Sequence, residues 1–234
     1  MCGRFALNVT PAEVEKLFGY EERPNFPPRD NIAPTEPIAV VTFENGQRHF
    51  RLMRWGLLPS WLKEPDGFPV LFNARGETIT TKPAFRAAAR HRRCLVPASG
   101  FYEWKQMGTK KVPHRLSRQD APLFAMAGLW EPYAHVNGSE IDTATIVTTS
   151  ASGVVADLHD RMPVIIPEDK FSIWLESETY SLDEAMALVH PAPVTYFKAE
   201  AFDPRRGPLT DIKPDEPKRR AVKPKPKDNQ GSLF

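Results

Sequence analysis

Short segments with the composition of β-strands recur along most of this chain and end at proline, glycine or polar residues. They lie at residues 4–9, 38–43, 47–54, 93–97, 100–105, 111–117, 123–130, 143–149, 164–166 and 194–201. Such runs bounded by turn residues are typical of strands, and Asn45-Gly46 predicts a hairpin turn. Helical patterns lie between them, at residues 10–18, 83–90, 152–158, 167–175 and 182–189. This order predicts an α+β fold with a curved, mostly antiparallel, barrel-like sheet.

The rest of the chain divides into loops and a tail. Residues 21–37 are rich in proline and predict a long irregular loop, as does the Gly- and Pro-broken stretch at 55–61. No repeat or linker occurs before about residue 203, so residues 1–202 are predicted to form one domain. Residues 203–234 carry nine Lys or Arg against five Asp or Glu. Because this Pro-rich segment cannot bury enough apolar surface to offset its ordering entropy, we predict a disordered basic tail.

Composition excludes several classes of protein. No apolar run approaches the roughly 20 residues that cross a bilayer, and no signal segment opens the chain. Two cysteines cannot form a disulfide framework, and no paired Cys or His spacing is typical of zinc. The net charge is only +2 and the tail alone exceeds it, so the body is not basic enough to indicate nucleic-acid binding. We expect a cytoplasmic monomer that uses no metal or cofactor and binds no membrane.

The second residue is a cysteine, which becomes the amino terminus if Met1 is removed. Cys2 would then carry a thiol and a free α-amine on adjacent carbons, with reference pKa values of about 8.5 and about 7.7–8.0. The amine can condense with an aldehyde to a Schiff base, and the thiol can close on the same carbon as a five-membered thiazolidine. The alternative is that Cys2 is a small apolar residue at the start of a strand.

Several short motifs together resemble one family. They are Met1-Cys2-Gly3-Arg4-Phe5, Asn31-Ile32-Ala33-Pro34, Arg54-Trp55-Gly56-Leu57-Leu58-Pro59-Ser60-Trp61, Phe72-Asn73-Ala74-Arg75-Gly76-Glu77, Arg93-Cys94-Leu95-Val96-Pro97, Gly100-Phe101-Tyr102-Glu103-Trp104-Lys105 and Leu158-His159-Asp160-Arg161-Met162-Pro163. In this order and spacing they resemble the SRAP family, the SOS-response-associated peptidases described as abasic-site processing proteins. The resemblance covers residues 1 to about 200.

The resemblance implies a sensor and shield for abasic sites in single-stranded DNA. Cys2 would trap the sugar aldehyde as a thiazolidine DNA–protein crosslink. An imine at the sugar also permits β-elimination, so strand cleavage by lyase chemistry is a second outcome. The peptidase name reflects the proposal that family members cleave off their own leading residue. The protein would act on damaged DNA at replication forks, close to the nucleoid.

Three further residues match the family's catalytic positions. Glu103 matches its catalytic glutamate, and burial would raise the carboxyl pKa and suit it to move protons. Strand alternation places Glu103 on one face with Phe101 and Lys105. His159 would protonate the ring oxygen or stabilise the alkoxide of the opening sugar. Asn73 would orient the nucleophilic amine and the sugar hydroxyls. The alternatives are a solvated carboxylate, a structural histidine and an ordinary loop asparagine.

The candidate DNA contacts are side chains of the same motifs and their neighbours. Guanidinium groups bind phosphate oxygens bidentately, and an aromatic side chain in a loop can stack on a base. The candidates are Arg4, Arg75, Arg86, Arg161, Leu58, Trp61 and Thr148. The alternative for Arg86 is a solvated helix face, and for Trp61 it is packing in the core. Cys94 lies in an apolar strand and is predicted to be inert.

The tail ends on Gln230-Gly231-Ser232-Leu233-Phe234. This pentapeptide resembles the motif with which bacterial proteins bind the sliding clamp of DNA polymerase. Gln230 would be the anchor, and Leu233 and Phe234 would fill an apolar pocket. Tethering to the clamp would raise the effective concentration of the protein at replication forks.

Two other functions share part of these features. An N-terminal-nucleophile cysteine peptidase or amidohydrolase would also use Cys2, but it would not need phosphate-binding arginines or Trp61. A non-covalent reader of damaged or modified single-stranded DNA would keep the arginines and leave Cys2 as a structural residue. Full activity of a Cys2→Ala variant would favour the reader.

Overall fold

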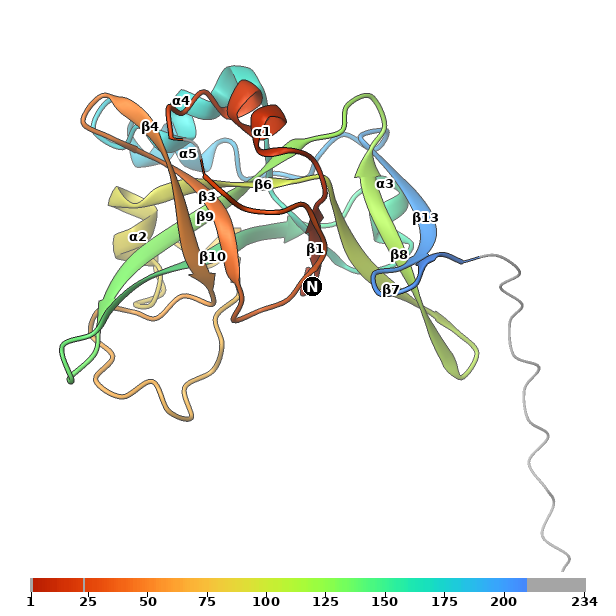
Figure 1. Cartoon of the computed structure of the whole chain (residues 1–234), viewed down its shortest axis with the longest axis horizontal. Helices are drawn as coiled ribbons and strands as arrows, with labels where there is room; N and C mark the ends of the chain where they lie inside the picture. The colour runs from red at the N-terminus through yellow and green to blue at the C-terminus, as the bar shows by residue number, and fades with distance from the viewer. Residues whose placement is uncertain (1, 23, 210–234) are drawn as a thin grey trace, which may run out of the picture.

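The computed structural model describes residues 2–22 and 24–209, which form two β-sheets with short helices around them (Figure 1). The strands are β1 Phe5–Leu7, β2 Arg29–Ile32, β3 Pro37–Glu44, β4 Gln47–Trp55, β5 Asn73–Arg75, β6 Arg93–Ala98, β7 Gly100–Met107, β8 Lys110–Arg118, β9 Phe124–Ala134, β10 Glu140–Ser150, β11 Arg161–Pro163, β12 Ile165–Ile166, β13 Phe197–Asp203 and β14 Gly207–Pro208. The helices are α1 Pro11–Phe18, α2 Arg86–His91, α3 Gly153–Ala156, α4 Phe171–Leu175 and α5 Leu182–Met186, with 3-10 helices η1 Gly76–Thr78 and η2 Glu168–Lys170. The predicted α+β class is confirmed.

One sheet closes on itself as a barrel of five strands. Its ring runs β10–β4–β3–β6–β9, and β9 pairs with β10 to complete it. Every pair in the ring is antiparallel except β10–β4, which is parallel. Outside the ring, the short strands β5 and β11 pair with β10, and β12 pairs with β9. Closure leaves the five ring strands without an open edge.

The second sheet is open and antiparallel, in the order β14-β13-β8-β7-β1-β2. The two strands predicted on either side of residues 98–99 therefore belong to different sheets, β6 to the barrel and β7 to the open sheet. Ser99 lies at this crossing, where its hydroxyl donates to the carbonyl of Ala6 at 3.1 Å and accepts from the N–H of Asn8 at 3.0 Å. These two bonds anchor β1 beside the start of β7.

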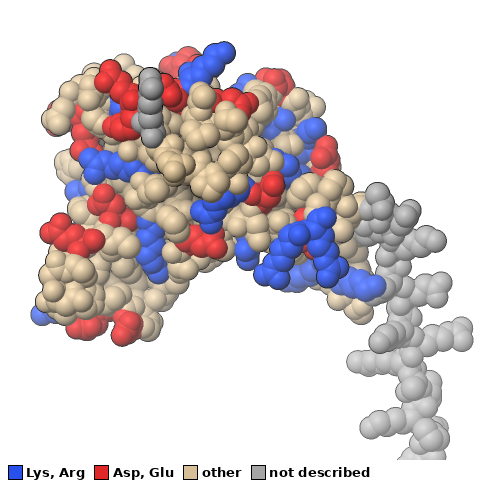
Figure 2. Space-filling model, viewed as in Figure 1, with Lys and Arg blue, Asp and Glu red and all other residues tan. Residues whose placement is uncertain are grey.

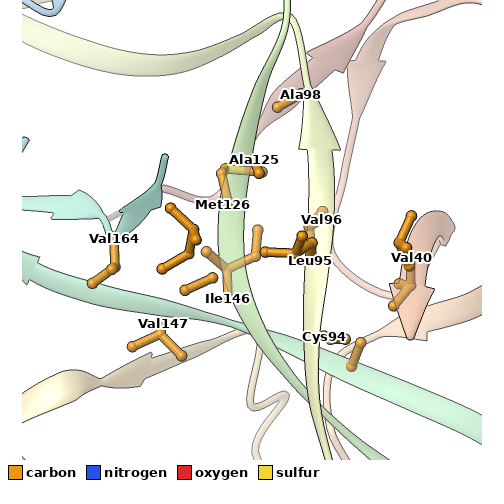
Figure 3. Packing of buried hydrophobic residues seen from close by; sticks show 14 of the residues in the cluster. Val40, Cys94, Leu95, Val96, Ala98, Ala125, Met126, Ile146, Val147 and Val164 are labelled. Atoms are coloured by element: carbon orange, nitrogen blue, oxygen red, sulfur yellow. The ribbon is translucent and has the colours of Figure 1, made fainter. Parts of the chain in front are cut away.

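The hydrophobic core fills the space between the barrel strands (Figure 3). Val40 of β3, Leu95 of β6, Met126 of β9 and Ile146 of β10 are all fully buried. Removing such side chains from water is the main contribution to the stability of a domain of this size. Cys94 lies in the same core, and burial raises the pKa of its thiol, as expected of an inert cysteine.

Two local elements form as the sequence predicts. Helix α1 begins with a capping box, in which the Thr10 N–H donates to the Glu13 carboxylate at 2.8 Å and the Glu13 N–H donates to the Thr10 hydroxyl at 3.3 Å. The β3–β4 hairpin turns at Asn45 and Gly46, whose φ angles of 51° and 82° suit asparagine and glycine. Both elements depend only on residues close in sequence.

Part of the predicted loop at residues 21–37 forms a strand instead. Residues Arg29–Ile32 make up β2, which pairs with β1 so that Ile32 lies opposite Phe5 and Arg29 opposite Leu7. These four residues have no strong strand pattern of their own. Pairing with the edge of β1 makes them a strand, which explains why the sequence alone predicted a loop.

The open sheet continues past residue 202, where we had predicted the tail to begin. β14 pairs with the end of β13, with Phe202 opposite Pro208, and the Leu209 N–H donates to the carbonyl of Ala201 at 3.0 Å. The boundary is therefore corrected to lie after residue 209 or later. The rest of the predicted tail, with the peptide at 230–234, lies outside the described residues. Between residues 2 and 209, none of the described helices has the length and apolar character of a membrane span.

Candidate functional site

Strand β1 places the N-terminal segment against β7 (Figure 1). The Tyr102 N–H of β7 donates to the carbonyl of Arg4 at 2.9 Å. Because β1 and β7 run antiparallel, the residues that precede Arg4 lie beside those that follow Tyr102. Cys2 is thereby brought close enough to Glu103 for the charge of Glu103 to affect the pKa of the thiol.

Asn73 reaches the same place from the barrel. Its strand β5 pairs in parallel with β10, with Asn73 opposite Ile146. The Asn73 Nδ2 donates to the carbonyl oxygen of Cys2 at 2.8 Å. The Asn73 Oδ1 is buried and has no hydrogen-bond partner among the residues that the structure describes. Asn73 therefore holds the backbone of Cys2 with one end of its amide and has an acceptor to offer a bound group with the other.

Glu103 and Cys2 are both buried, and their charges are coupled. Glu103 is only 4% exposed, which excludes the alternative of a solvated carboxylate. Burial raises the pKa of its carboxyl, and the charge of His159 opposes that shift. Burial and the nearby charge of Glu103 raise the pKa of the Cys2 thiol, whose Sγ lies 3.9 Å from the carbonyl oxygen of Arg4. The thiol is therefore protonated at neutral pH, beside a carboxyl group that can exchange protons.

His159 follows α3 and is held in one orientation by its neighbours. Its backbone N–H donates to the carbonyl of Val155 at 2.9 Å, and its ring Nδ1 accepts from the backbone N–H of Arg161 at 2.9 Å. An amide N–H can only donate, so the proton of the neutral ring is on Nε2. The Asp160 carboxylate lies 2.7 Å from the same ring nitrogen and is 84% exposed.

Arg161 forms an ion pair with a carboxylate that the sequence did not indicate as its partner. Its guanidinium donates to both carboxylate oxygens of Glu77, at 2.5 and 2.8 Å, and to the carbonyl of Thr148 at 2.7 Å. This ion pair lowers the pKa of the Glu77 carboxyl. A DNA phosphate would have to compete with Glu77 for Arg161, so Arg161 is less free for the predicted contact than its sequence motif indicated.

Thr148 lies beside Arg161. Its side chain is fully buried, and its hydroxyl lies 3.4 Å from the carbonyl oxygen of Ala74. The Arg161 guanidinium donates to the same hydroxyl at 3.4 Å, and the contact of Thr148 with DNA stays a prediction. Gly76 packs against the backbone of Thr148, at a position where an added Cβ atom would clash with the side chain of Val189. This close packing accounts for the glycine between Arg75 and Glu77.

A family model described as SOS response associated peptidase (SRAP) matches residues 1–205. The chain belongs to the SRAP family. It is similar to Abasic site processing protein YoaM of Bacillus subtilis, with 37% identity over 195 residues that cover 82% of this chain and 86% of that protein. It is also similar to Abasic site processing protein YedK of Escherichia coli, with 31% identity, 76% of this chain and 81% of that protein.

Relatives outside bacteria and solved structures agree with this SRAP assignment. Abasic site processing protein HMCES of Xenopus tropicalis is 29% identical, covering 84% of this chain and 72% of that protein. A crystal structure of a protein from Bordetella bronchiseptica has a TM-score of 0.76 at 26% identity and covers 86% of this chain and all of that one. A protein from Bacteroides thetaiotaomicron has a TM-score of 0.79 at 24% identity, covering 86% and 92%, and shows the same fold.

The remaining candidate DNA contacts of this SRAP chain lie nearer the surface. Trp61 is 57% exposed and touches Phe68 edge-on, which excludes the alternative that it packs in the core. Arg75 and Arg86 are exposed, although Figure 1 shows α2, which carries Arg86, well away from the N-terminus. Arg4 is half-buried and donates to the Asn31 side chain at 3.0 Å.

Leu58, the last of the candidates, is half-buried in the loop that also carries Trp61. Its backbone N–H donates to the hydroxyl of Thr143 at 3.0 Å, which attaches the start of the loop to β10. As for metals, the described part of the chain holds no group of three or more His, Cys, Asp and Glu placed to bind an ion.

Proposed function

We propose that this protein recognises abasic sites in single-stranded DNA and links to them covalently through Cys2. The observation that carries the proposal is the convergence of Cys2 with Glu103, Asn73 and His159, which come from four separate parts of the chain. The relatives are named abasic site processing proteins, and an abasic sugar in its open form offers the aldehyde that an amino-terminal cysteine traps.

The covalent step needs no external oxidant or cofactor. After removal of Met1, the Cys2 amine attacks C1′ of the open sugar, and the carbinolamine loses one water to give an imine. The Cys2 thiol adds to the same carbon, the C–S bond closes the thiazolidine, and the thiol proton ends on the ring nitrogen. The complete reaction releases one water molecule per crosslink.

Each buried side chain suits one part of this sequence. Glu103 has a raised pKa, so it can hold a proton for the departing hydroxyl and take one from the attacking amine. His159, with its proton on Nε2, can protonate the sugar oxygen as the ring opens. Asn73 holds the backbone of Cys2, so the amine and thiol enter the reaction already oriented.

Two further activities of the proposed site compete with or precede the crosslink. Abstraction of a proton next to the imine would lead to β-elimination and strand cleavage, so the rate of thiol closure determines how much lyase product forms. Cleavage of the Met1–Cys2 bond by the site itself would make the protein its own peptidase. A cysteine peptidase acting on other amides, and a non-covalent DNA reader, are the functions that remain if no crosslink forms.

The direct test is to incubate the purified protein with single-stranded DNA that carries one abasic site. A denaturing gel should show a slow-migrating adduct. Its intact mass should equal that of the protein without Met1 plus the DNA minus one water. Absence of an adduct, although Met1 is confirmed to be removed, would contradict the proposal and favour the peptidase or the reader.

Replacing Asn73 with alanine should slow adduct formation about fivefold, because one hydrogen bond that orients the nucleophile contributes about 1 kcal/mol and a tenfold change needs about 1.4 kcal/mol. The rate should be measured by quenching the reaction at several times under DNA excess. Asn137→Ala is the matched control, since Asn137 is exposed in the β9–β10 turn and bonds only within that turn. Equal rates of adduct formation for Asn73→Ala and wild type would show that Asn73 does not orient the nucleophile.

Deletion of residues 230–234 should abolish binding to the DNA polymerase sliding clamp. We propose that Gln230, Leu233 and Phe234 dock on the clamp and bring a cytoplasmic, monomeric protein to replication forks. The matched control replaces Ser232 with alanine and keeps the three anchors. Retention on immobilised clamp should be lost only in the deletion, and undiminished retention of the truncated chain would refute the docking peptide. Crosslinking to DNA in solution should be equal in all three proteins.

A further inference from the structure

We propose that the open sheet carries a second DNA-binding surface, which holds the phosphates of one flank of the strand whose lesion enters the Cys2 site. This inference rests on the proposed function and adds where the flanking DNA lies. We define the basic surface by three exposed residues that two hairpins bring together, namely Lys111, Arg205 and Arg206.

The topology of the open sheet gathers these cations from distant parts of the chain. Lys111 lies on the β7–β8 hairpin, where it is opposite Gln106 and two residues before Pro113 of the same strand. Arg205 and Arg206 form the turn between β13 and β14, and β13 pairs with β8. In Figure 2, Lys and Arg side chains gather at the lower right, where Figure 1 draws β7, β8 and β13.

One hollow links the basic surface to Arg4. It is lined by Arg4, Asn31, Trp104, Pro113, Asp203, Pro204 and Arg205. Arg4 is two residues from Cys2 and contributes the carbonyl next to its thiol, while Arg205 belongs to the basic surface. A DNA strand that passes Arg4 on leaving the lesion would therefore reach the basic surface across this hollow.

Among the described residues, none of Lys111, Arg205 and Arg206 forms a salt bridge, in contrast to Arg161, which Glu77 holds. Asp203 is the acidic residue in the hollow, and its carboxylate already accepts from the backbone N–H of Arg205 at 2.8 Å. Cations that are exposed and close together raise the local concentration of a polyanion and bind phosphates by releasing counterions.

The opposite lobe differs in both charge and polarity. The notch at the lower edge of Figure 2 separates the basic surface from the lobe formed by the loop at residues 56–72 and the β9–β10 hairpin. That lobe exposes the acidic residues Glu64, Asp66 and Glu140 and the apolar side chains of Trp61 and Val136. It suits stacking on bases better than contact with phosphates, so the two flanks of the lesion should be bound differently.

The test measures non-covalent binding in a Cys2→Ala background to single-stranded DNA that carries a tetrahydrofuran analogue of the abasic sugar. The analogue has no aldehyde, so no imine can form with the α-amine, and the DNA is shortened stepwise from either end. The double substitution Lys111→Glu with Arg206→Glu should weaken binding about tenfold or more at low salt. It should also lower the slope of affinity against salt by about 1.4, which is the loss of two phosphate contacts. The loss should persist when one flank is shortened and disappear when the other is removed, which identifies the flank that the basic surface holds.

The matched control is the double substitution Lys16→Glu with Arg90→Glu. Lys16 is an exposed cation on α1 and Arg90 is an exposed cation on α2. It makes the same change in net charge, so equal weakening in both double variants, or a loss that does not depend on either flank, would overturn the inference. The neutral pair Lys111→Gln with Arg206→Gln should show the same flank dependence with a smaller loss. With Cys2 restored and with abasic DNA that offers the aldehyde at saturation, the charge variants should still form the adduct. Failure of the wild type to form the adduct would refute the proposed function, but it would leave the result on non-covalent binding unaffected.

Discussion

Cys2→Ala should abolish the stable DNA adduct down to the detection limit of a denaturing gel. Alanine keeps the α-amine once Met1 is removed, so an imine with the abasic sugar can still form. Without the thiol no C–S bond closes, and the imine hydrolyses or leads to β-elimination. The variant should therefore leave a species that borohydride traps, and it should cleave the DNA more than wild type does.

Two controls make this result specific to the amino-terminal thiol. Cys94→Ala removes the other cysteine of the chain, which is fully buried in the core, and its adduct should form as in wild type. A variant that retains Met1 ahead of Cys2 keeps the thiol but carries its free α-amine on Met1, so no five-membered thiazolidine can close and no stable adduct should form. A stable adduct in Cys2→Ala would contradict the thiazolidine and indicate another nucleophile.

Glu103→Gln should slow crosslinking by about 10²- to 10⁴-fold, the usual contribution of a positioned acid or base. Glutamine keeps the shape of the side chain but cannot exchange protons with the amine or the departing hydroxyl. Between pH 5 and 9, the pre-steady-state rate of crosslinking by wild type should rise and then fall with increasing pH. In the variant, either the rise or the fall of this pH–rate profile should be missing. Glu131→Gln is a suitable control, because Glu131 is equally buried but bonds to Arg92 instead. An unchanged pH profile would exclude Glu103 from proton transfer.

The same substitution should stabilise the fold at neutral and alkaline pH. Burial raises the pKa of Glu103 in the folded protein, whereas in the unfolded chain the carboxyl titrates near about 4.3. The unfolded state therefore loses its proton first, and folding stability falls as pH rises from about 4.3 through the folded pKa. Because glutamine does not ionise, the melting temperatures of variant and wild type should be close at pH 4 and diverge at pH 8. A difference that shrinks with rising pH would show that the carboxylate is not destabilised by burial.

This combination is informative about why the site is buried. A change that slows the reaction while stabilising the protein is the behaviour of a group held in an unfavourable state for its chemistry. Replacing a residue that has a purely structural role would instead lower the stability of the folded protein. Glu103 can thus be distinguished from its structural alternative by two measurements on one variant.

Local rules account for the elements that the sequence predicted correctly. The Thr10–Glu13 capping box and the Asn45-Gly46 turn depend on residues within three positions of each other, so their patterns are readable in the chain itself. The chemistry open to Cys2 is also a local property, because it follows from a thiol and an α-amine on one residue. The family could be identified for the same reason, since its motifs are short and contiguous.

Only the tertiary structure determined which of these residues act together. Glu103 is buried beside Cys2 because β1 pairs with β7, and Asn73 reaches Cys2 because β5 pairs with β10. The pairing of Arg161 with Glu77 spans 84 positions in the sequence, and the strand β2 exists only through its pairing with β1. The sequence by itself thus indicated the candidate nucleophile and determined the fold class and the local turns. The protonation states and the partners of each group depended on contacts between distant strands, because burial and electrostatic interactions are set by neighbours in space.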